Sequence, residues 1–167
     1  MKLEDAILTA IAHEEKVREV YREAAASVRD HRCRSILAVL GEDEDRHVEY
    51  LEEHLDRWRR TGRLDVQRLE SVIVPDGEIA EEGRRLSRTL PDNPHGDEKQ
   101  VLSRALQVEQ ETAGFYRGLV AEMTGEAQEL FAGFLAVEER HVAAVQAQLD
   151  YYSRTGYWFG TKEFDME

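Results

Sequence analysis

Apolar residues recur along this chain at alternating steps of three and four positions, over four long stretches separated by shorter segments. This spacing places apolar side chains on one face of an α-helix, as in a helix that packs against its neighbours along a seam. We therefore predict four helices, at about residues 3–29, 32–60, 98–123 and 126–154. The predicted seams begin at Leu3 in the first helix and end at Trp58 in the second.

The connections between these helices predict the topology. Short joints near Asp30 and at Thr124-Gly125 allow only antiparallel neighbours, which gives two helical hairpins. The segment of about 63–97 between the hairpins holds all three prolines, and its middle, Asp76 to Leu90, could form a short extra helix. We expect a single domain over residues 1–167, an all-α antiparallel four-helix bundle whose hairpins are joined by this long crossover.

Composition excludes several classes of protein. The net charge of −13 argues against a nucleic-acid partner, because contacts with phosphates need a concentrated basic surface. No apolar run approaches the ~20 residues that cross a bilayer, so we expect no membrane partner. Charged residues at the N-terminus stand where a signal peptide would be apolar, so we expect a cytoplasmic protein. Cys33 is the only cysteine, which excludes a disulfide framework and a thiolate metal site.

Polar residues interrupt the seams near their middles, and they form two copies of one sparse pattern. Glu14 and Tyr21 recur 95 positions later as Glu109 and Tyr116. Glu44-x-x-His47 recurs 94 positions later as Glu138-x-x-His141. Little else is shared between the copies, so carboxylates and imidazoles are repeated while the surrounding residues differ. This repeat predicts two half-sites that face each other across a pseudo-twofold axis.

These seam positions create a problem of charge. Burying an ionised carboxylate without a partner costs several kcal/mol, and four carboxylates together would also repel one another. Lysine and arginine are absent from the four seams, so either protons or bound cations must compensate the charge. Metal ions are the simpler solution, because Glu and His three positions apart lie on one helix face and reach one centre.

The ligand set also indicates which metal is bound. A known arrangement in bundles uses one Glu from each of two helices and a Glu-x-x-His from each of the other two, around two metal ions. This chain supplies that set once, and mixed carboxylate and imidazole ligands suit iron or manganese. We therefore predict two ions of iron or manganese per subunit, with zinc as another occupant. The predicted ligands are Glu14, Glu44, His47, Glu109, Glu138 and His141.

Taken singly, the residues of this pattern also have simpler interpretations. One Glu-x-x-His on a helix is common without a metal, and one histidine on a seam is usually a hydrogen-bonded core residue. Two copies in register, each with a seam glutamate upstream and a tyrosine seven positions after it, favour the two-metal site. Tyr21 and Tyr116 are predicted first as packing residues that could also bond to the ligands. His54, one heptad beyond His47, is predicted as a core or rim histidine.

At these residues the chain resembles the ferritin-like superfamily and, within it, the rubrerythrin-like proteins. The resemblance covers all four helices, and it implies a non-haem di-iron centre that reacts with hydrogen peroxide or dioxygen. It also implies that Glu44 and Glu138 bridge the two metals. Glu14 with His47 would complete one ion, and Glu109 with His141 the other.

The sequence departs from rubrerythrins in two respects. Rubrerythrins carry a C-terminal rubredoxin domain with four iron-binding cysteines, whereas this chain has one cysteine, so we expect a separate electron-donor protein. Rubrerythrins also have a glutamate three residues after the third-helix ligand, and it is associated with peroxidase behaviour. Here that position is Thr112, which puts peroxidase activity in doubt without affecting the metal site.

Three functions therefore compete. The first is an oxidoreductase with a role in oxidative stress, which uses hydrogen peroxide or dioxygen. The second is iron handling, by ferroxidase chemistry or storage as in ferritins. The third is a metal-free helical interaction module, which would leave four buried glutamates unexplained. The resemblance implies a homodimer or higher homo-oligomer, with the aromatic tail Tyr157-Trp158-Phe159 as one contact.

Overall fold

The predicted helices are present. A computed structural model describes residues 1–29, 31–66, 69 and 96–155, and within these residues it has four α-helices and no strand. They are α1 (Leu3–Ser27), α2 (His31–Thr61), α4 (Gly96–Glu122) and α5 (Gly125–Thr155). Each end lies within two residues of its predicted position, so the all-α four-helix class is confirmed.

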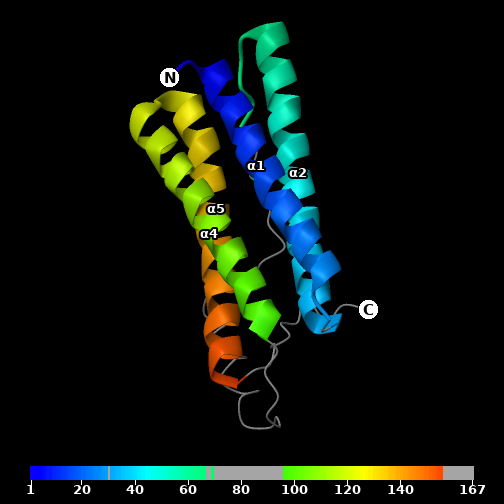
Figure 1. The fold of residues 1–167 in the computed structure, drawn as a ribbon. Helices are drawn as coiled ribbons and strands as arrows, with labels where there is room; N and C mark the ends of the chain where they lie inside the picture. The colour runs from blue at the N-terminus through cyan, green and yellow to red at the C-terminus, as the bar shows by residue number, and fades with distance from the viewer. Residues whose placement is uncertain (30, 67–68, 70–95, 156–167) are drawn as a thin grey trace.

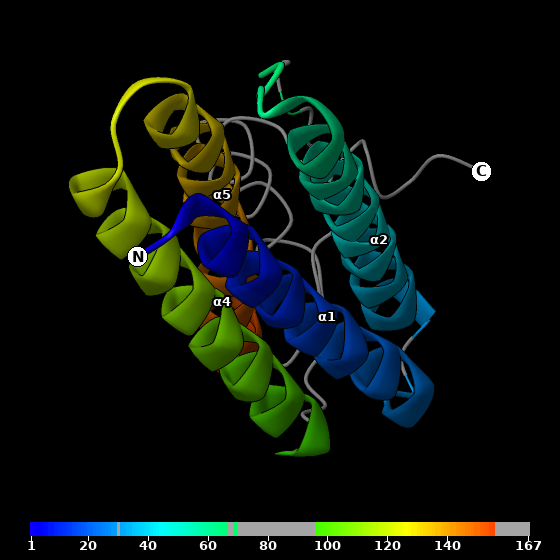
Figure 2. The ribbon, with the colours of Figure 1, turned by 90° about the horizontal axis from the view of Figure 1, so that it is seen from above.

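The helices form two antiparallel hairpins, α1 with α2 and α4 with α5, and the hairpins meet where α1 lies beside α4 (Figures 1 and 2). α2 ends at the end of the bundle opposite to the start of α4 (Figure 1). The end of α2 and the start of α4, which the predicted crossover has to join, thus lie at opposite ends of the bundle. The short helix predicted within this crossover and the aromatic tail lie outside the described residues.

Two glycines shape the helix ends. Gly62 follows α2 with φ of +66°, and its N–H donates a 2.8 Å hydrogen bond to the carbonyl of Trp58. Gly125, with φ of +62°, stands at the start of α5, just after the joint with α4. Both positions need the left-handed backbone region, which glycine enters without steric cost.

The apolar core is divided into two clusters. One lies toward the N-terminal end of α1 and includes Ile7, Leu51, Leu119, Phe131 and Phe134. The other lies toward the opposite end of the bundle and includes Val17, Leu37, Leu40, Leu102 and Val145. The predicted ligands occupy the helix positions between the two clusters, so the middle of the bundle is polar.

The predicted seam residues are buried near the middle of each helix, but the buried face of each helix is wider than the predicted seam. Leu3 and Trp58 are only half-buried, because they lie near helix ends. Residues beside the seams, such as Val20, Ile36 and Val137, are buried as well. A helix in a bundle contacts two neighbours, so its buried stripe is wider than one ridge. In the described part of the chain, no helix is both long and apolar enough to cross a membrane.

Candidate metal centre

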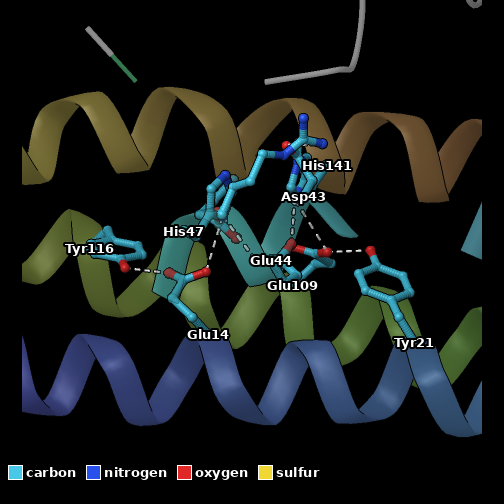
Figure 3. A network of polar contacts seen from close by, with 10 residues as sticks. Glu14, Tyr21, Asp43, Glu44, His47, Glu109, Tyr116 and His141 are labelled. Atoms are coloured by element: carbon cyan, nitrogen blue, oxygen red, sulfur yellow. Dashed lines mark hydrogen bonds and ion pairs between the residues drawn. The ribbon is translucent and has the colours of Figure 1, made fainter. Parts of the chain in front are cut away.

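The structure brings all six predicted ligands together at mid-bundle, and their side chains are fully buried. α1 contributes Glu14 and α4 contributes Glu109, while α2 and α5 each contribute a Glu-x-x-His pair, one helical turn apart. Figure 3 shows side chains from all four helices that converge on one polar cluster.

These residues form two overlapping groups. In each group the carboxylate oxygens and imidazole nitrogens lie within 4.8 Å of one another. One group contains Glu14, Glu44, His47 and Glu138, and the other contains Glu44, Glu109, Glu138 and His141. Glu44 and Glu138 are therefore common to both groups, and each group adds one further glutamate and one histidine.

Glu44 lies between the two imidazole rings. Its Oε2 is 2.9 Å from Nδ1 of His47, and its Oε1 is 2.9 Å from Nδ1 of His141. The rings are nearly parallel, with an interplanar angle of 13° and centroids 5.5 Å apart. Both Nδ1 atoms thus face the carboxylates, which is the side from which a shared pair of ions would be bound.

Each of the two repeated tyrosines forms a hydrogen bond with the glutamate of the other repeat. The hydroxyl of Tyr21, on α1, donates to Oε1 of Glu109 on α4, and the hydroxyl of Tyr116, on α4, donates to Oε1 of Glu14 on α1 (Figure 3). Burial, together with the neighbouring carboxylate Glu109 or Glu14, raises both tyrosine pKa values well above 10. Each tyrosine is therefore a donor throughout the neutral pH range.

Sequence reasoning missed Asp43. Its side chain is fully buried, and its Oδ2 lies 3.1 Å from Nε2 of His141, on the side of the ring away from the glutamates. The corresponding position in the second repeat is Val137, so comparison of shared residues passed over it. Its position directly before Glu44 was a weak signal, since a ligand histidine usually donates its outer N–H to a carboxylate.

Two other positions discussed from the sequence, His54 and Thr112, lie in the interior of the bundle. His54 is 4% exposed, and its two ring nitrogens lie 2.7 Å from the carbonyl oxygen of Tyr50 and 2.9 Å from that of Asp65. It is thus a core histidine that connects α2 to the chain after it. Thr112 is 1% exposed on α4, and Val17 holds the corresponding position on α1. The third-helix position that is glutamate in rubrerythrins thus lies in the interior.

The histidines have high proton affinity without a metal. Burial alone would lower the pKa of His47, but the charge of Glu44 and the hydrogen bond with Glu14 outweigh it and raise the pKa to about 10. Burial also opposes the charge on His141, yet Glu44, Glu109 and the contact with Asp43 raise its pKa well above 6.5. In the metal-free protein both rings are therefore imidazolium ions at neutral pH.

The glutamates divide into two classes. Burial raises the pKa of Glu14 to about 8, and burial with the charges of Glu14 and Glu44 raises the pKa of Glu138 well above 4.5. Burial acts in the same direction on Glu44, but His47 and His141 prevail and hold its pKa well below 4.5. Protons thus compensate the buried charge when no cation does so.

The unsatisfied atoms in this cluster fit metal ions. Both carboxylate oxygens of Glu138 and Oε2 of Glu109 are buried and have no hydrogen-bond partner within the described structure. Buried polar atoms are normally paired, so a group of unpaired acceptors at one place needs an explanation. Oxygen and imidazole donors in this number match a centre of two transition-metal ions.

Comparison with known proteins supports the fold. The family model of the ferritin-like domain matches residues 5–150, which include all six predicted ligands. Neither a curated protein nor a solved structure shows significant similarity to the chain.

Proposed function

Because the chain belongs to the ferritin-like family, we propose that it is a non-haem di-iron oxidoreductase that reacts with hydrogen peroxide or dioxygen. The observation that carries this proposal is the pair of overlapping groups of buried donors that share Glu44 and Glu138. In this proposal Glu44 and Glu138 would serve as ligands to both ions. Glu14 with His47 completes one ion, and Glu109 with His141 completes the other.

The chain's own residues hold the centre in position. Tyr21 and Tyr116 orient Glu109 and Glu14, so one terminal carboxylate of each ion is fixed by the opposite repeat. Asp43 accepts a hydrogen bond from Nε2 of His141, which leaves Nδ1 of that ring for the metal. The two apolar clusters on either side keep water from the ligands. Bound iron supplies the exchange of electrons with the oxidant.

The remaining features of the proposal follow from the rubrerythrin-like pattern. A separate protein supplies electrons, and the enzyme works in the cytoplasm as a homodimer or higher homo-oligomer. Thr112 in place of a glutamate leaves hydrogen peroxide and dioxygen as alternatives, so the oxidant has to be determined by experiment.

Metal content tests the ligand assignment. Wild-type protein, Glu138→Ala and a control, Glu139→Ala, would be purified without chelator and measured by elemental analysis. Glu139 is the next residue, but it is exposed and pairs with Arg117, so its loss should leave metal content unchanged. We expect about two metals per subunit in wild type and in the control, and a clear loss in Glu138→Ala. An unchanged metal content in Glu138→Ala would refute the assignment.

Spectroscopy then tests the reaction. Anaerobic ferrous protein would be mixed with hydrogen peroxide or with dioxygen, and its absorbance followed in wild type and Glu138→Ala. A rapid spectral change in wild type that is absent in the variant supports the oxidoreductase. Retention of hundreds of irons per assembly would instead indicate iron storage, and protein that folds and purifies without metal would favour an interaction module.

A further inference from the structure

A cleft separate from the metal centre opens between the second half of α2 and the first half of α5. Its volume is about 460 Å³, within the range of small-molecule sites. Apolar side chains of Leu130 and Ala136 on α5, and of Val66 and Leu69 after α2, form part of its walls. Such a lining suits the apolar body of a small organic molecule.

Arg140 adds a positive charge to this wall. Its side chain is partly buried, and its Nε atom is buried without a hydrogen-bond partner. Within the described structure, the guanidinium makes no ion pair or hydrogen bond at all. Arginine stays protonated at every physiological pH, so the cleft contains a fixed and uncompensated cation.

The internal repeat explains why Arg140 has no partner. Its counterpart in the first repeat, Arg46, has Nη2 3.2 Å from Oδ1 of Asp43, one turn earlier on α2. In the second repeat, Val137 takes the place of that aspartate, so α5 offers no acid at this distance. Glu139 is next to Arg140 in sequence, but it pairs with Arg117 at 2.8 Å.

The carboxylate that also lines the cleft is too far away to neutralise this cation. Glu129 is exposed and precedes Arg140 by eleven residues on the same helix, which corresponds to a rise of about 16 Å. The two charges therefore mark opposite ends of the cleft, with the apolar walls between them. An anionic group would be favoured at the Arg140 end.

We propose that this cleft binds a small organic carboxylate, with its carboxylate on the guanidinium of Arg140 and its apolar body against the cleft walls. The planar guanidinium matches a carboxylate with two parallel hydrogen bonds, which gives both strength and orientation. None of the six metal ligands lines this cleft. The two sites are nevertheless close, because the ring of Phe134 packs against the rings of both Tyr50, which lines the cleft, and His47. The distances between ring centroids are 5.8 Å and 5.6 Å.

Calorimetric titration of the metal-loaded protein with 2-naphthoate, and with the neutral amide of the same shape, tests this proposal. We expect 2-naphthoate to bind about tenfold more tightly than the amide, since only the carboxylate forms charge-assisted hydrogen bonds. Arg140→Gln should weaken 2-naphthoate by about tenfold and leave the amide unaffected. Arg104→Gln is the matched control, because it removes an equal charge from an exposed position on α4 that does not line the cleft, and it should change neither affinity.

A second variant tests the cleft without altering the cation. Ala136→Trp places a large side chain in the cleft from an exposed position, and it should abolish binding of both molecules. Equal affinities for the carboxylate and the amide, equal affinities in wild type and Arg140→Gln, binding that persists in Ala136→Trp, or no binding at millimolar concentration would each overturn the proposal. Metal content should be unchanged in all variants, so this result is separate from that of the ligand assignment.

Discussion

His141 and Asp43 are joined through the outer side of the imidazole ring, with Nε2 and Oδ2 3.1 Å apart between α5 and α2. The other histidine of the centre differs, since Nε2 of His47 has no hydrogen-bond partner within the described structure. The six ligands and the two tyrosines follow a pseudo-twofold pattern, and the outer contacts of the two histidines do not. The two proposed ions should therefore differ in affinity, with the tighter one at His141.

Asp43→Asn should weaken one ion selectively. The amide does not carry the charge that strengthens the contact with His141, and loss of such an outer contact typically lowers metal affinity about 10–100-fold. Stepwise metal titration would resolve the two binding events. Asp45→Asn is the control, since Asp45 lies on the same helix, is partly exposed and pairs with Arg18 and Arg22. Equal weakening of both ions would contradict the predicted asymmetry.

Removal of a tyrosine hydroxyl should destabilise the metal-free protein. Tyr116→Phe leaves Oε1 of Glu14 without its donor in a fully buried place, which costs about 1–3 kcal/mol of unfolding free energy. Urea denaturation of Tyr116→Phe, Glu14→Gln and the double variant should give a coupling energy of about 0.5–3 kcal/mol. The variants Tyr21→Phe and Glu109→Gln, with their double variant, give the corresponding coupling energy for the equivalent hydrogen bond. Additive single effects would show that these hydrogen bonds contribute nothing to stability.

The stability of the metal-free protein should fall as the pH rises from about 6.5 to 10. Folding raises the pKa of His47 from 6.5 to about 10, so its stabilising effect is complete below pH 6.5 and is lost as the pH passes through 10. Folding raises the pKa of Glu14 from 4.5 to about 8, which adds a loss of stability between those values. Each group contributes at most about 1.4 kcal/mol per pH unit.

Urea denaturation of chelator-treated protein across this pH range measures the effect. The metal-loaded protein should show a flatter dependence, because the ions hold the same ligands in their deprotonated forms. The double variant His47→Gln with Glu14→Gln is the matched control, and its dependence should also be flatter. Stability of the metal-free protein that increased with pH would contradict the assigned proton affinities.

Metal binding near neutral pH should release protons. The pKa values of His47 and Glu14 are raised to about 10 and about 8, and those of His141 and Glu138 are also raised, so ions must displace protons to reach these ligands. Zinc added to unbuffered metal-free protein at pH 7 should acidify the solution, as His47 and Glu14 give up their protons to the solvent. The release should decrease as the starting pH rises. Less than about one proton per ion would mean that the ligands are already deprotonated.

The sequence was sufficient to predict much of this structure, for a physical reason. Helix periodicity places Glu14 and Glu109 on seams between apolar residues, and a buried carboxylate in a bundle needs a counter-charge. The positions of all four helices and the convergence of the six side chains follow from that register. The sequence predicts Tyr21 first as a packing residue that could also bond to the ligands, and the structure shows a hydrogen bond to Glu109.

The contact of Asp43 and the charge of Arg140 in a cleft could not be predicted from the residues that the two repeats share. Both features depend on a difference between the repeats, Asp43 against Val137, whose consequence appears only when the helices are placed side by side. Asp43 contacts a histidine on another helix, and no periodicity within α2 indicates which residue it meets. The state of assembly, the electron donor and the oxidant are properties of partners, and they remain predictions.

Each proposed ion draws ligands from both hairpins, so a single hairpin that pairs with an identical copy would generate the same six ligands. In such a symmetric dimer, any residue beside one ion would stand beside the other as well. Covalent connection of the two hairpins removes this constraint, and each half can then change alone. The contact of Asp43 with His141, and an Arg140 that has no partner among the described residues, are differences between the repeats that a joined chain can acquire. The long connection between α2 and α4 thus allows the surroundings of the two proposed metal positions to differ.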